Sequence, residues 1–332
     1  MPGSFHRRGF LALAAAALPT SLRAAATHKI AALFAGKVDD GGFMQAGYDG
    51  LKLAESRLGV AVAFEQGVAP RPEELAAALR KLAGNRPDLV IAHGGQNNAA
   101  AKTVAAEFPD VRFVVTQGNV TGSNLASYEV LQEHSAFLAG MLAGLTTRTG
   151  VVGHMSGIRV TPGLKGRAAY LNGVRHANPT AQVLTNFSGN QDDNALSKKV
   201  AAAMIAAKAD IIFTMLNAGR TGAIEACRDG DAKQIGNVRD WTLVEPEVFV
   251  ASAFADAGQA LLNATQDLVQ GRFAAGQIRQ IGLESPEAVR LTIAPSVPSD
   301  VRSKVEAMAA EIAARRFEVP TEWQGEEFQN PA

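Results

Sequence analysis

Cysteine is almost missing from this sequence of 332 residues, in which Cys227 is the only one. A single cysteine cannot form an internal disulfide bond, and no cysteine follows the N-terminal segment to carry a lipid anchor. An excess of one charge is missing too, because 32 basic residues balance 32 acidic ones. Nucleic acids and anionic lipids attract clusters of basic residues, so we expect neither as a partner.

Long apolar runs are also lacking. The stretch Leu11–Leu18 follows Arg7 and Arg8 and is far shorter than the ~20 residues that span a bilayer. Ala24–Ala26 then supplies a small-residue cleavage pattern, so we expect residues 1–26 to be a signal peptide. The paired arginines favour twin-arginine export over an ordinary secretory signal. Either route predicts a soluble protein in the periplasm.

Catalytic and metal-binding patterns are absent as well. The segment His93-Gly-Gly95 resembles the oxyanion loop of esterases, which requires a Gly-x-Ser-x-Gly elbow elsewhere. In Gly153–Gly157 the serine comes one position late, and no His, Asp or Cys spacing fits a metal site. We therefore expect no enzyme, no cofactor and no metal, and keep a secreted α/β hydrolase only as a minor alternative.

What the sequence does contain is a regular alternation of strand-like and helix-like segments. The expected strands fall into two similar sets followed by a tail: 29–34, 60–64, 88–92 and 111–116; 151–155, 182–187, 210–215 and 233–236; then 249–254 and 289–293. Expected helices cover 43–58, 72–82, 98–108, 133–148, 162–177, 194–207, 257–270 and 299–314. Such alternation predicts parallel sheets with right-handed crossovers.

The two sets of strands predict two doubly wound α/β lobes joined by a hinge. Pro87-Asp-Leu-Val-Ile-Ala92 and Ala209-Asp-Ile-Ile-Phe-Thr214 occupy the same place in each set. We expect residues 28–132 plus about 252–275 to form lobe one. Residues 149–250 plus about 285–320 would form lobe two, with the helix 133–148 at their junction. Two lobes facing each other across a hinge describe a clamshell binding protein.

The turn after the first strand, Val38-Asp-Asp-Gly-Gly-Phe43, is the most informative local feature. Ligands of open α/β sheets bind outside the carboxyl ends of the strands, where this turn offers two carboxylates and an aromatic ring. A purely structural interpretation has Asp39 and Asp40 capping the following helix. Likewise, Phe187 could belong to the core and Arg220 could pair with Glu225.

The expected wall of the cleft is rich in amides and carries aromatic rings, which together suit a flat polar heterocycle. Amide groups supply both donors and acceptors, while rings add stacking worth roughly 1–3 kcal/mol per base. The candidate ligand-binding residues are Asp39, Asp40, Phe43, Met44, Gln45, Gln96, Asn97, Gln117, Phe187, Gln191, Asp193, Asn217, Arg220, Asp240 and Trp241.

Several segments resemble the basic-membrane-protein or PnrA-like substrate-binding components of ABC importers. Val38-Asp-Asp-Gly-Gly-Phe-Met-Gln45 is similar to that family's V-D-D-K-S-F-N-Q. Further similar blocks are Pro87–Gly95, Val104–Phe113, Ser135–Gly144, Thr149–Gly153, Asn178-Pro179, Asp193 and Ile235-Gly236. The resemblance implies a type I periplasmic-binding-protein fold, a purine nucleoside or nucleobase ligand and an inner-membrane permease as partner. We expect a monomer.

The resemblance also assigns residues and shows departures. Phe43 matches the aromatic residue of the opening motif, and Asp240 matches the second Asp of a later one. Departures from the family pattern occur at Met44, Gln117, Gln191, Val238 and Trp241, and a lysine usual near 251–255 is absent. The lost carboxylates and lysine could hold ribose hydroxyls, so a nucleobase or oxidised purine is expected rather than a nucleoside. A periplasmic sensor that signals to a membrane receptor remains an alternative to transport.

Overall fold

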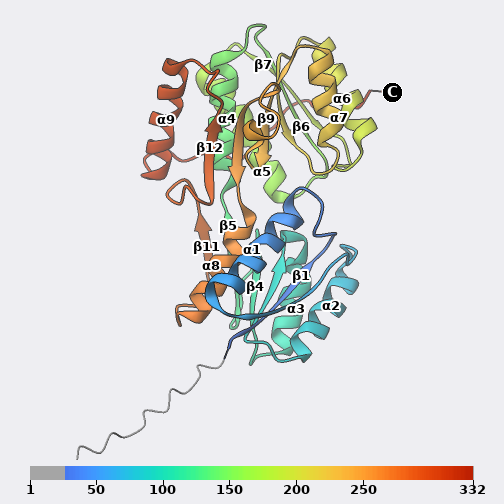
Figure 1. Cartoon of the computed structure of the whole chain (residues 1–332), viewed down its shortest axis with the longest axis vertical. Coiled ribbons are helices and arrows are strands. Elements are labelled where there is room, and N and C mark those ends of the chain that lie inside the picture. Colours follow the sequence, from blue (N-terminus) through green and yellow to red (C-terminus); the bar gives the residue numbers. More distant parts are fainter. Residues whose placement is uncertain (1–26, 332) are drawn as a thin grey trace, which may run out of the picture.

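The computed structural model describes residues 27–331, and the expected signal peptide lies outside them. In this part of the chain two α/β lobes stand end to end along the long axis of the molecule (Figure 1). The chain crosses between the lobes before α4, between β10 and α8, and again between β11 and β12. Each lobe is therefore discontinuous in sequence, as the alternation predicts.

The first lobe is built on a parallel sheet with strand order β11-β5-β4-β3-β1-β2. Its strands are β1 (Lys29–Phe34), β2 (Ala61–Glu65), β3 (Leu89–His93), β4 (Arg112–Thr116), β5 (Leu125–Val130) and β11 (Ile278–Ile281). Helices α1 (Phe43–Leu58) and α8 (Ala257–Val269) pack on one face, and α2 (Pro72–Gly84) and α3 (Asn98–Glu107) on the other. Gly59, with φ of 66°, ends α1 in a left-handed cap that glycine adopts readily.

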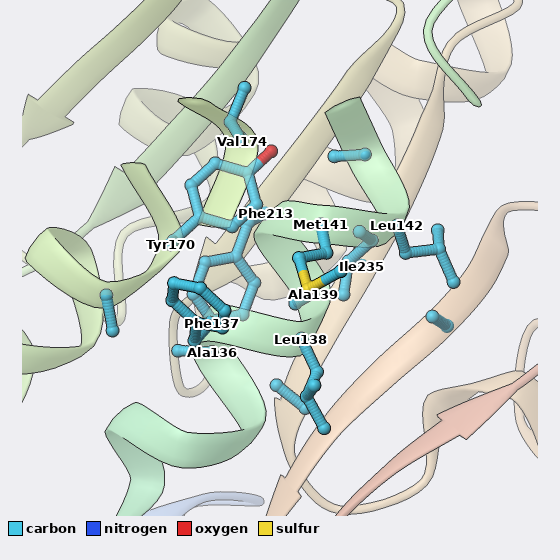
Figure 2. Close-up of a cluster of buried hydrophobic side chains, with 14 of the residues drawn as sticks. Ala136, Phe137, Leu138, Ala139, Met141, Leu142, Tyr170, Val174, Phe213 and Ile235 are labelled. Atoms are coloured by element: carbon cyan, nitrogen blue, oxygen red, sulfur yellow. The ribbon is translucent and has the colours of Figure 1, made fainter. Parts of the chain in front are cut away.

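The second lobe repeats this arrangement with strand order β12-β10-β9-β8-β6-β7. Its strands are β6 (Val151–Ser156), β7 (Gln182–Phe187), β8 (Ile211–Met215), β9 (Lys233–Val238), β10 (Phe249–Ala255) and β12 (Val289–Ile293). One face carries α4 (Gln132–Thr146), α5 (Thr161–Ala177) and α9 (Ser299–Ala313), and the other carries α6 (Asn194–Ala206) and α7 (Arg220–Asp229). Buried rings of Phe137, Tyr170 and Phe213 join α4 and α5 to the sheet (Figure 2).

The internal repeat extends to hydrogen bonds. Asp88 accepts a bond from the backbone N–H of Lys29 at 2.8 Å, just where β1 begins. Asp210, its counterpart, accepts from the N–H groups of Arg148 at 2.6 Å and Thr149 at 3.2 Å, just before β6. In both lobes one aspartate thus fixes the entrance of the first strand, which the matching Pro-Asp and Ala-Asp segments anticipate.

Some details differ from the sequence-based expectations. Strands β5 and β11 were not anticipated, and β12 runs antiparallel to β10. Strand β10 pairs with β9 and β12 up to Ala255, so the chain leaves the second lobe after the boundary expected at 252. Helix α4 packs against α5 and β10 within the second lobe. No helix among the described residues is both long and apolar enough to cross a membrane.

Candidate ligand-binding site

The loops that follow the central strands of the two lobes touch each other. In both sheets the first and third strands of the lobe are neighbours, so the connections that follow them diverge to opposite faces. Such a switch point at the carboxyl ends of strands is where open α/β sheets bind ligands. Here Asn217, after β8, donates its side-chain N–H to Asp40 Oδ2, after β1, at 3.4 Å. This contact places the candidate site between the lobes.

The Asp40 carboxylate organises its own turn as well as touching the second lobe. It accepts hydrogen bonds from the backbone N–H groups of Gly42 at 2.8 Å, Met44 at 3.1 Å and Gln45 at 3.1 Å. Gln45 Oε1 accepts from the N–H of Gly41 at 3.1 Å, which closes the same turn. Asp40 therefore caps the start of α1 and also contacts the second lobe. One carboxylate has enough lone pairs to accept all of these hydrogen bonds.

Phe43 lies flat against His93, which ends β3. Their ring centroids are 4.2 Å apart with an interplanar angle of 20°. His93 Nε2–H donates to the carbonyl oxygen of Phe43 at 2.9 Å, so Nδ1 accepts from the hydroxyl of Thr116 at 2.8 Å. Burial lowers the pKa of His93 to about 4, although the bond to Phe43 opposes that shift. A neutral, fully hydrogen-bonded imidazole thus supports one face of the partly exposed Phe43 ring.

Two amides follow His93 and behave differently. Asn97 is fully buried, and its Nδ2 donates to the carbonyl oxygens of His93 and Gly94, both at 3.0 Å. Its Oδ1 is buried without a hydrogen-bond partner. Gln96 is exposed, and its Nε2 donates to the same His93 carbonyl at 3.3 Å. Among the described residues, Asn97 Oδ1 is therefore an acceptor left without a donor near the end of β3.

Arg220 links the carboxyl ends of β8 and β9 in the second lobe through hydrogen bonds. Its guanidinium donates to Thr214 Oγ1 at 2.8 Å, to the Leu216 carbonyl and to Asn237 Oδ1 at 2.5 Å. The guanidinium also lies 4.5 Å from the ring centre of Trp241. The pairing with Glu225 considered from the sequence is wrong, since Glu225 pairs with Lys198.

The charge of Arg220 is buried and has no acidic partner within ion-pair distance in residues 27–331. Burial lowers its pKa to about 9, and the charge of Arg239 adds to that shift. Its Nε is buried without an acceptor. A guanidinium with these surroundings favours ligands that bring carbonyl oxygens, because burying an unpaired donor is costly.

Gln191 and Asp193 shape the loop opposite Asn217. The carbonyl oxygen of Gln191 accepts from the N–H groups of Asn217 at 3.1 Å and Gly219 at 3.0 Å. Asp193 caps α6 by accepting from the N–H of Leu196 at 3.0 Å. These contacts bring the loop after β7 against the loop after β8, next to the residues that touch the first lobe.

Other predicted residues make contacts within their own lobes. Gln117 bridges to the next strand, donating to the Val130 carbonyl at 3.0 Å and accepting from its N–H at 2.5 Å. Asp240 caps the short helix at Trp241 and accepts from the Thr292 hydroxyl at 3.0 Å. Met44 packs against the apolar core of the first lobe. Asp39 is exposed, and Phe187 lies under two arginines.

His93 and Thr116 are the residues that sequence reasoning undervalued. Both end buried strands, yet neither was chosen as a candidate site residue. The signal was present, because a histidine at the end of an all-apolar strand must find partners for two ring nitrogens. Their hydrogen bonds make them the support of Phe43.

Two cavities of the structure lie away from these residues. One of about 320 Å³ is lined by α9, β12 and the crossing segment near Leu283 and Pro286. Another of about 220 Å³ lies near Asp210 and Pro298. None of the predicted site residues lines either cavity. No cluster of acidic, histidine or cysteine side chains in residues 27–331 could hold a metal ion.

Comparison with known proteins adds independent information. Residues 27–322 match the family model for "ABC transporter substrate-binding protein PnrA-like". The chain is 22% identical over 300 residues to basic membrane protein A of Borreliella burgdorferi, covering 88% of each chain. It is 23% identical over 212 residues to a protein of Brucella abortus named as purine-binding, covering 63% of this chain and 59% of that one.

A solved structure shows the same architecture. The solute-binding protein of an ABC transporter system from Aeropyrum pernix superimposes with a TM-score of 0.78 at 20% identity, covering 89% of this chain and 94% of that one. The two lobes, with six-stranded sheets that are parallel except for β12, thus confirm the type I periplasmic-binding-protein fold. The family model covers nearly all described residues and belongs to binding proteins rather than enzymes. The chain therefore belongs to the Bmp family, the PnrA-like substrate-binding proteins of ABC transporters.

Proposed function

We propose that this protein binds a purine nucleobase or a related flat heterocycle between its two lobes, in the periplasm, and delivers it to an inner-membrane permease. The observation that carries this proposal is the Phe43 ring, supported from behind by His93 at 4.2 Å and next to the Asp40–Asn217 contact. The purine-binding relative from Brucella abortus supports the same ligand class.

Phe43 suits a heterocycle because its ring is already stacked on His93 and remains partly exposed. A base stacked on the other face would gain roughly 1–3 kcal/mol. Among the described residues, Asn97 Oδ1 in the first lobe and Arg220 Nε in the second are a buried acceptor and a buried donor without partners. A base edge carries groups of both kinds.

A base fits these residues better than a nucleoside. Gln117 stands where relatives often have an aspartate, and its amide is fully engaged with Val130. Val238 stands where the family has another aspartate. Ribose hydroxyls need such acceptors when they are buried, and this chain has lost them.

Closure of the two lobes on the ligand would produce the form of the protein that the permease recognises. The Asp40–Asn217 hydrogen bond joins the lobes, and a ligand that contacts both sides would favour this arrangement over a more open one. Such a ligand shifts the equilibrium by its difference in affinity for the two states.

Thermal-shift measurements with purine bases and their nucleosides, followed by calorimetry, test the proposal. A base at ~100-fold excess over its dissociation constant should add about 2.7 kcal/mol of stability. Larger shifts with nucleosides would contradict the preference for bases. If no purine of either kind raised the melting temperature, the ligand class itself would be wrong.

A further inference from the structure

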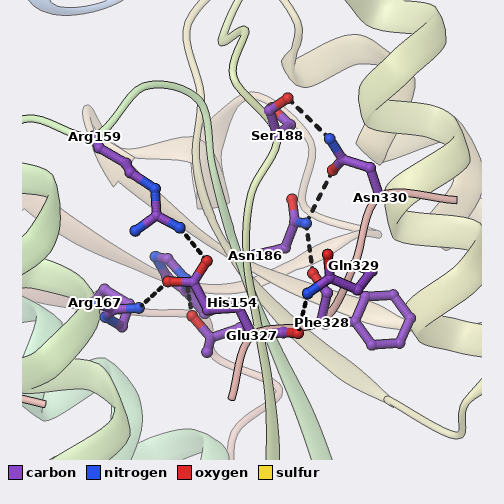
Figure 3. Close-up of polar contacts among 10 residues, drawn as sticks. His154, Arg159, Arg167, Asn186, Ser188, Glu327, Phe328, Gln329 and Asn330 are labelled. Atoms are coloured by element: carbon purple, nitrogen blue, oxygen red, sulfur yellow. Dashed lines mark hydrogen bonds and ion pairs between the residues drawn. The ribbon is translucent and has the colours of Figure 1, made fainter. Parts of the chain in front are cut away.

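The C-terminal tail after α9 returns to the second lobe and covers the outer edge of β7. Strand β7 is last in the order of its sheet, so its outer edge has no neighbouring strand. The N–H of Phe328 donates to the carbonyl of Thr185 at 2.8 Å, and Asn186 Nδ2 donates to the carbonyl of Phe328 at 2.7 Å. Asn330 Nδ2 donates to the carbonyl of Ser188 at 3.1 Å (Figure 3). Covering an open edge in this way prevents pairing with other chains.

One residue of the tail does more than cover the edge. Glu327 pairs with Arg167 on α5 at 2.9 Å and with Arg159 in the loop between β6 and α5 (Figure 3). Burial alone would raise the pKa of Glu327, but the hydrogen bonds from both arginines hold it below its ordinary value. In the part of the chain that the structure describes, Glu327 is the acid within ion-pair distance of either arginine.

The two arginines in turn hold Phe187. The guanidinium carbons of Arg159 and Arg167 lie 4.9 and 5.3 Å from the centre of its ring. Trp323 of the tail lies on Arg167 as well, at 4.3 Å from its ring centre to the guanidinium carbon. Arg167 is 6% exposed, so its position depends on these neighbours. The tail thus fixes the side chains at the carboxyl end of β7.

The position of Arg159 connects the tail to the candidate site. Its loop follows β6, as the Asp40–Phe43 turn follows β1, and the strand orders make these two connections equivalent in the two lobes. The same loop contains Gly157, whose Cα faces Gln191 of the loop that contacts Asn217. Glu327 therefore contributes a negative charge next to the loop that follows β6, on the second-lobe side of the site.

We propose that Glu327 is a positioning and specificity-determining residue, which fixes Arg159 and Phe187 and compensates one of the two positive charges of Arg159 and Arg167. With the carboxylate present, this wall suits an uncharged heterocycle. Without the Glu327 carboxylate, the charges of both guanidinium groups would be uncompensated. The wall would then favour an anionic heterocycle. The specificity part rests on the proposed function, whereas the positioning part does not.

The test compares Glu327→Gln with wild type and with Glu311→Gln. Glu311, on α9, forms an exposed ion pair with Arg316 just after that helix, through two hydrogen bonds of 2.8 Å each. Its variant therefore controls for the loss of an Arg–Glu pair. Trypsin should cleave after Arg159 about tenfold faster in Glu327→Gln, because the loop loses its partner. Glu311→Gln should match wild type at that bond.

Calorimetry with hypoxanthine, which is neutral near pH 7, and urate, which is an anion, tests specificity. The urate-to-hypoxanthine affinity ratio should rise about fivefold in Glu327→Gln. The rise should be smaller at high salt, because salt screens the attraction between urate and the two arginines. Glu327→Asp keeps the negative charge, so its urate-to-hypoxanthine affinity ratio should equal that of wild type. This variant can be measured even if Glu327→Gln folds poorly.

The outcomes are distinct. If Glu327→Gln behaves like Glu311→Gln in both assays, the proposal is overturned. Faster cleavage with an unchanged ratio would support the positioning role of Glu327 and overturn its role in specificity. Wild-type protein that binds neither purine would refute the proposed function, and the cleavage rates alone would then decide the positioning role.

Discussion

Asn217 and Asp40 join the two lobes through a hydrogen bond of 3.4 Å between Nδ2 and Oδ2. Both residues belong to loops that follow central strands, so the contact lies where the repeated architecture brings the two sheets together. Asp40 also receives three backbone N–H groups of its own turn. Movement of the second lobe is therefore coupled directly to the turn that presents Phe43.

Replacing Gly42 with alanine should hinder this closed arrangement. A β-carbon on Gly42 would overlap Asn217 Oδ1, and such overpacking typically costs 1–3 kcal/mol. We expect ligand affinity to fall by about tenfold or more, while the unliganded protein remains folded. Calorimetry gives the affinity, and small-angle scattering with and without ligand gives the degree of closure.

Gly84→Ala is the matched control for that change. No heavy atom lies within 4 Å of its added β-carbon, and it ends α2. It should leave affinity unchanged and raise stability by up to about 1 kcal/mol. An unaltered affinity in Gly42→Ala as well would mean that the ligand binds without the Asn217 contact.

Removing the ring of Phe43 should weaken binding without unfolding the protein. Phe43→Ala loses the stacking face but leaves His93 hydrogen-bonded to the backbone carbonyl of the same residue. We expect an affinity loss of roughly 1–3 kcal/mol, in line with stacking on aromatic side chains. Phe64→Ala, on the edge strand β2 and 37% exposed, should retain wild-type affinity. Survival of binding in Phe43→Ala would place the stacking wall elsewhere.

Gln117 should prove to be a structural residue. Gln117→Ala removes both hydrogen bonds to Val130. The buried N–H and carbonyl of Val130 then have no partner, which costs about 1–3 kcal/mol for each group. We expect the free energy of unfolding in urea to drop by a few kcal/mol, while the ligand dissociation constant of the folded protein stays the same. A change confined to ligand affinity would restore Gln117 to the binding site.

The fold was predictable from the sequence because buried parallel strands leave a strong local signal. Gln182–Phe187 and Val289–Ile293 agree with the expected bounds. Strand β11 is four residues long and largely exposed, so its pairing with β5 depends on the lobe crossing and not on local pattern. The antiparallel course of β12 also arises from that crossing.

The site was harder to predict because partners far apart in sequence decide what a polar side chain does. Gln117 and Asn97 are both amides after buried strands, yet one is engaged with Val130 and the other keeps a free Oδ1. The tail residues Trp323–Asn330 show no periodic pattern, and their contacts with β7 and Arg167 are long-range. The sequence therefore predicts the region of the candidate site, at the carboxyl ends of the strands, but not the role of each residue in it.

His93 should make the stability of the protein depend on pH below neutrality. Burial lowers its folded-state pKa to about 4, whereas a free histidine titrates near 6.5. The unfolded chain therefore binds this proton first, so the free energy of unfolding should fall as pH drops from about 6.5 to 4. The full effect is about 3 kcal/mol at the lower end.

His154, with a pKa lowered to about 3 by burial, acts in the same direction, so a single variant must isolate the contribution of His93. In His93→Gln the decrease in unfolding free energy between pH 6.5 and 4 should be smaller by about 3 kcal/mol than in wild type. Urea titrations across that range measure both curves. Parallel curves would mean that folded His93 accepts a proton as readily as the unfolded chain does. Its burial argues against this, as does the bond that Nδ1 accepts from Thr116.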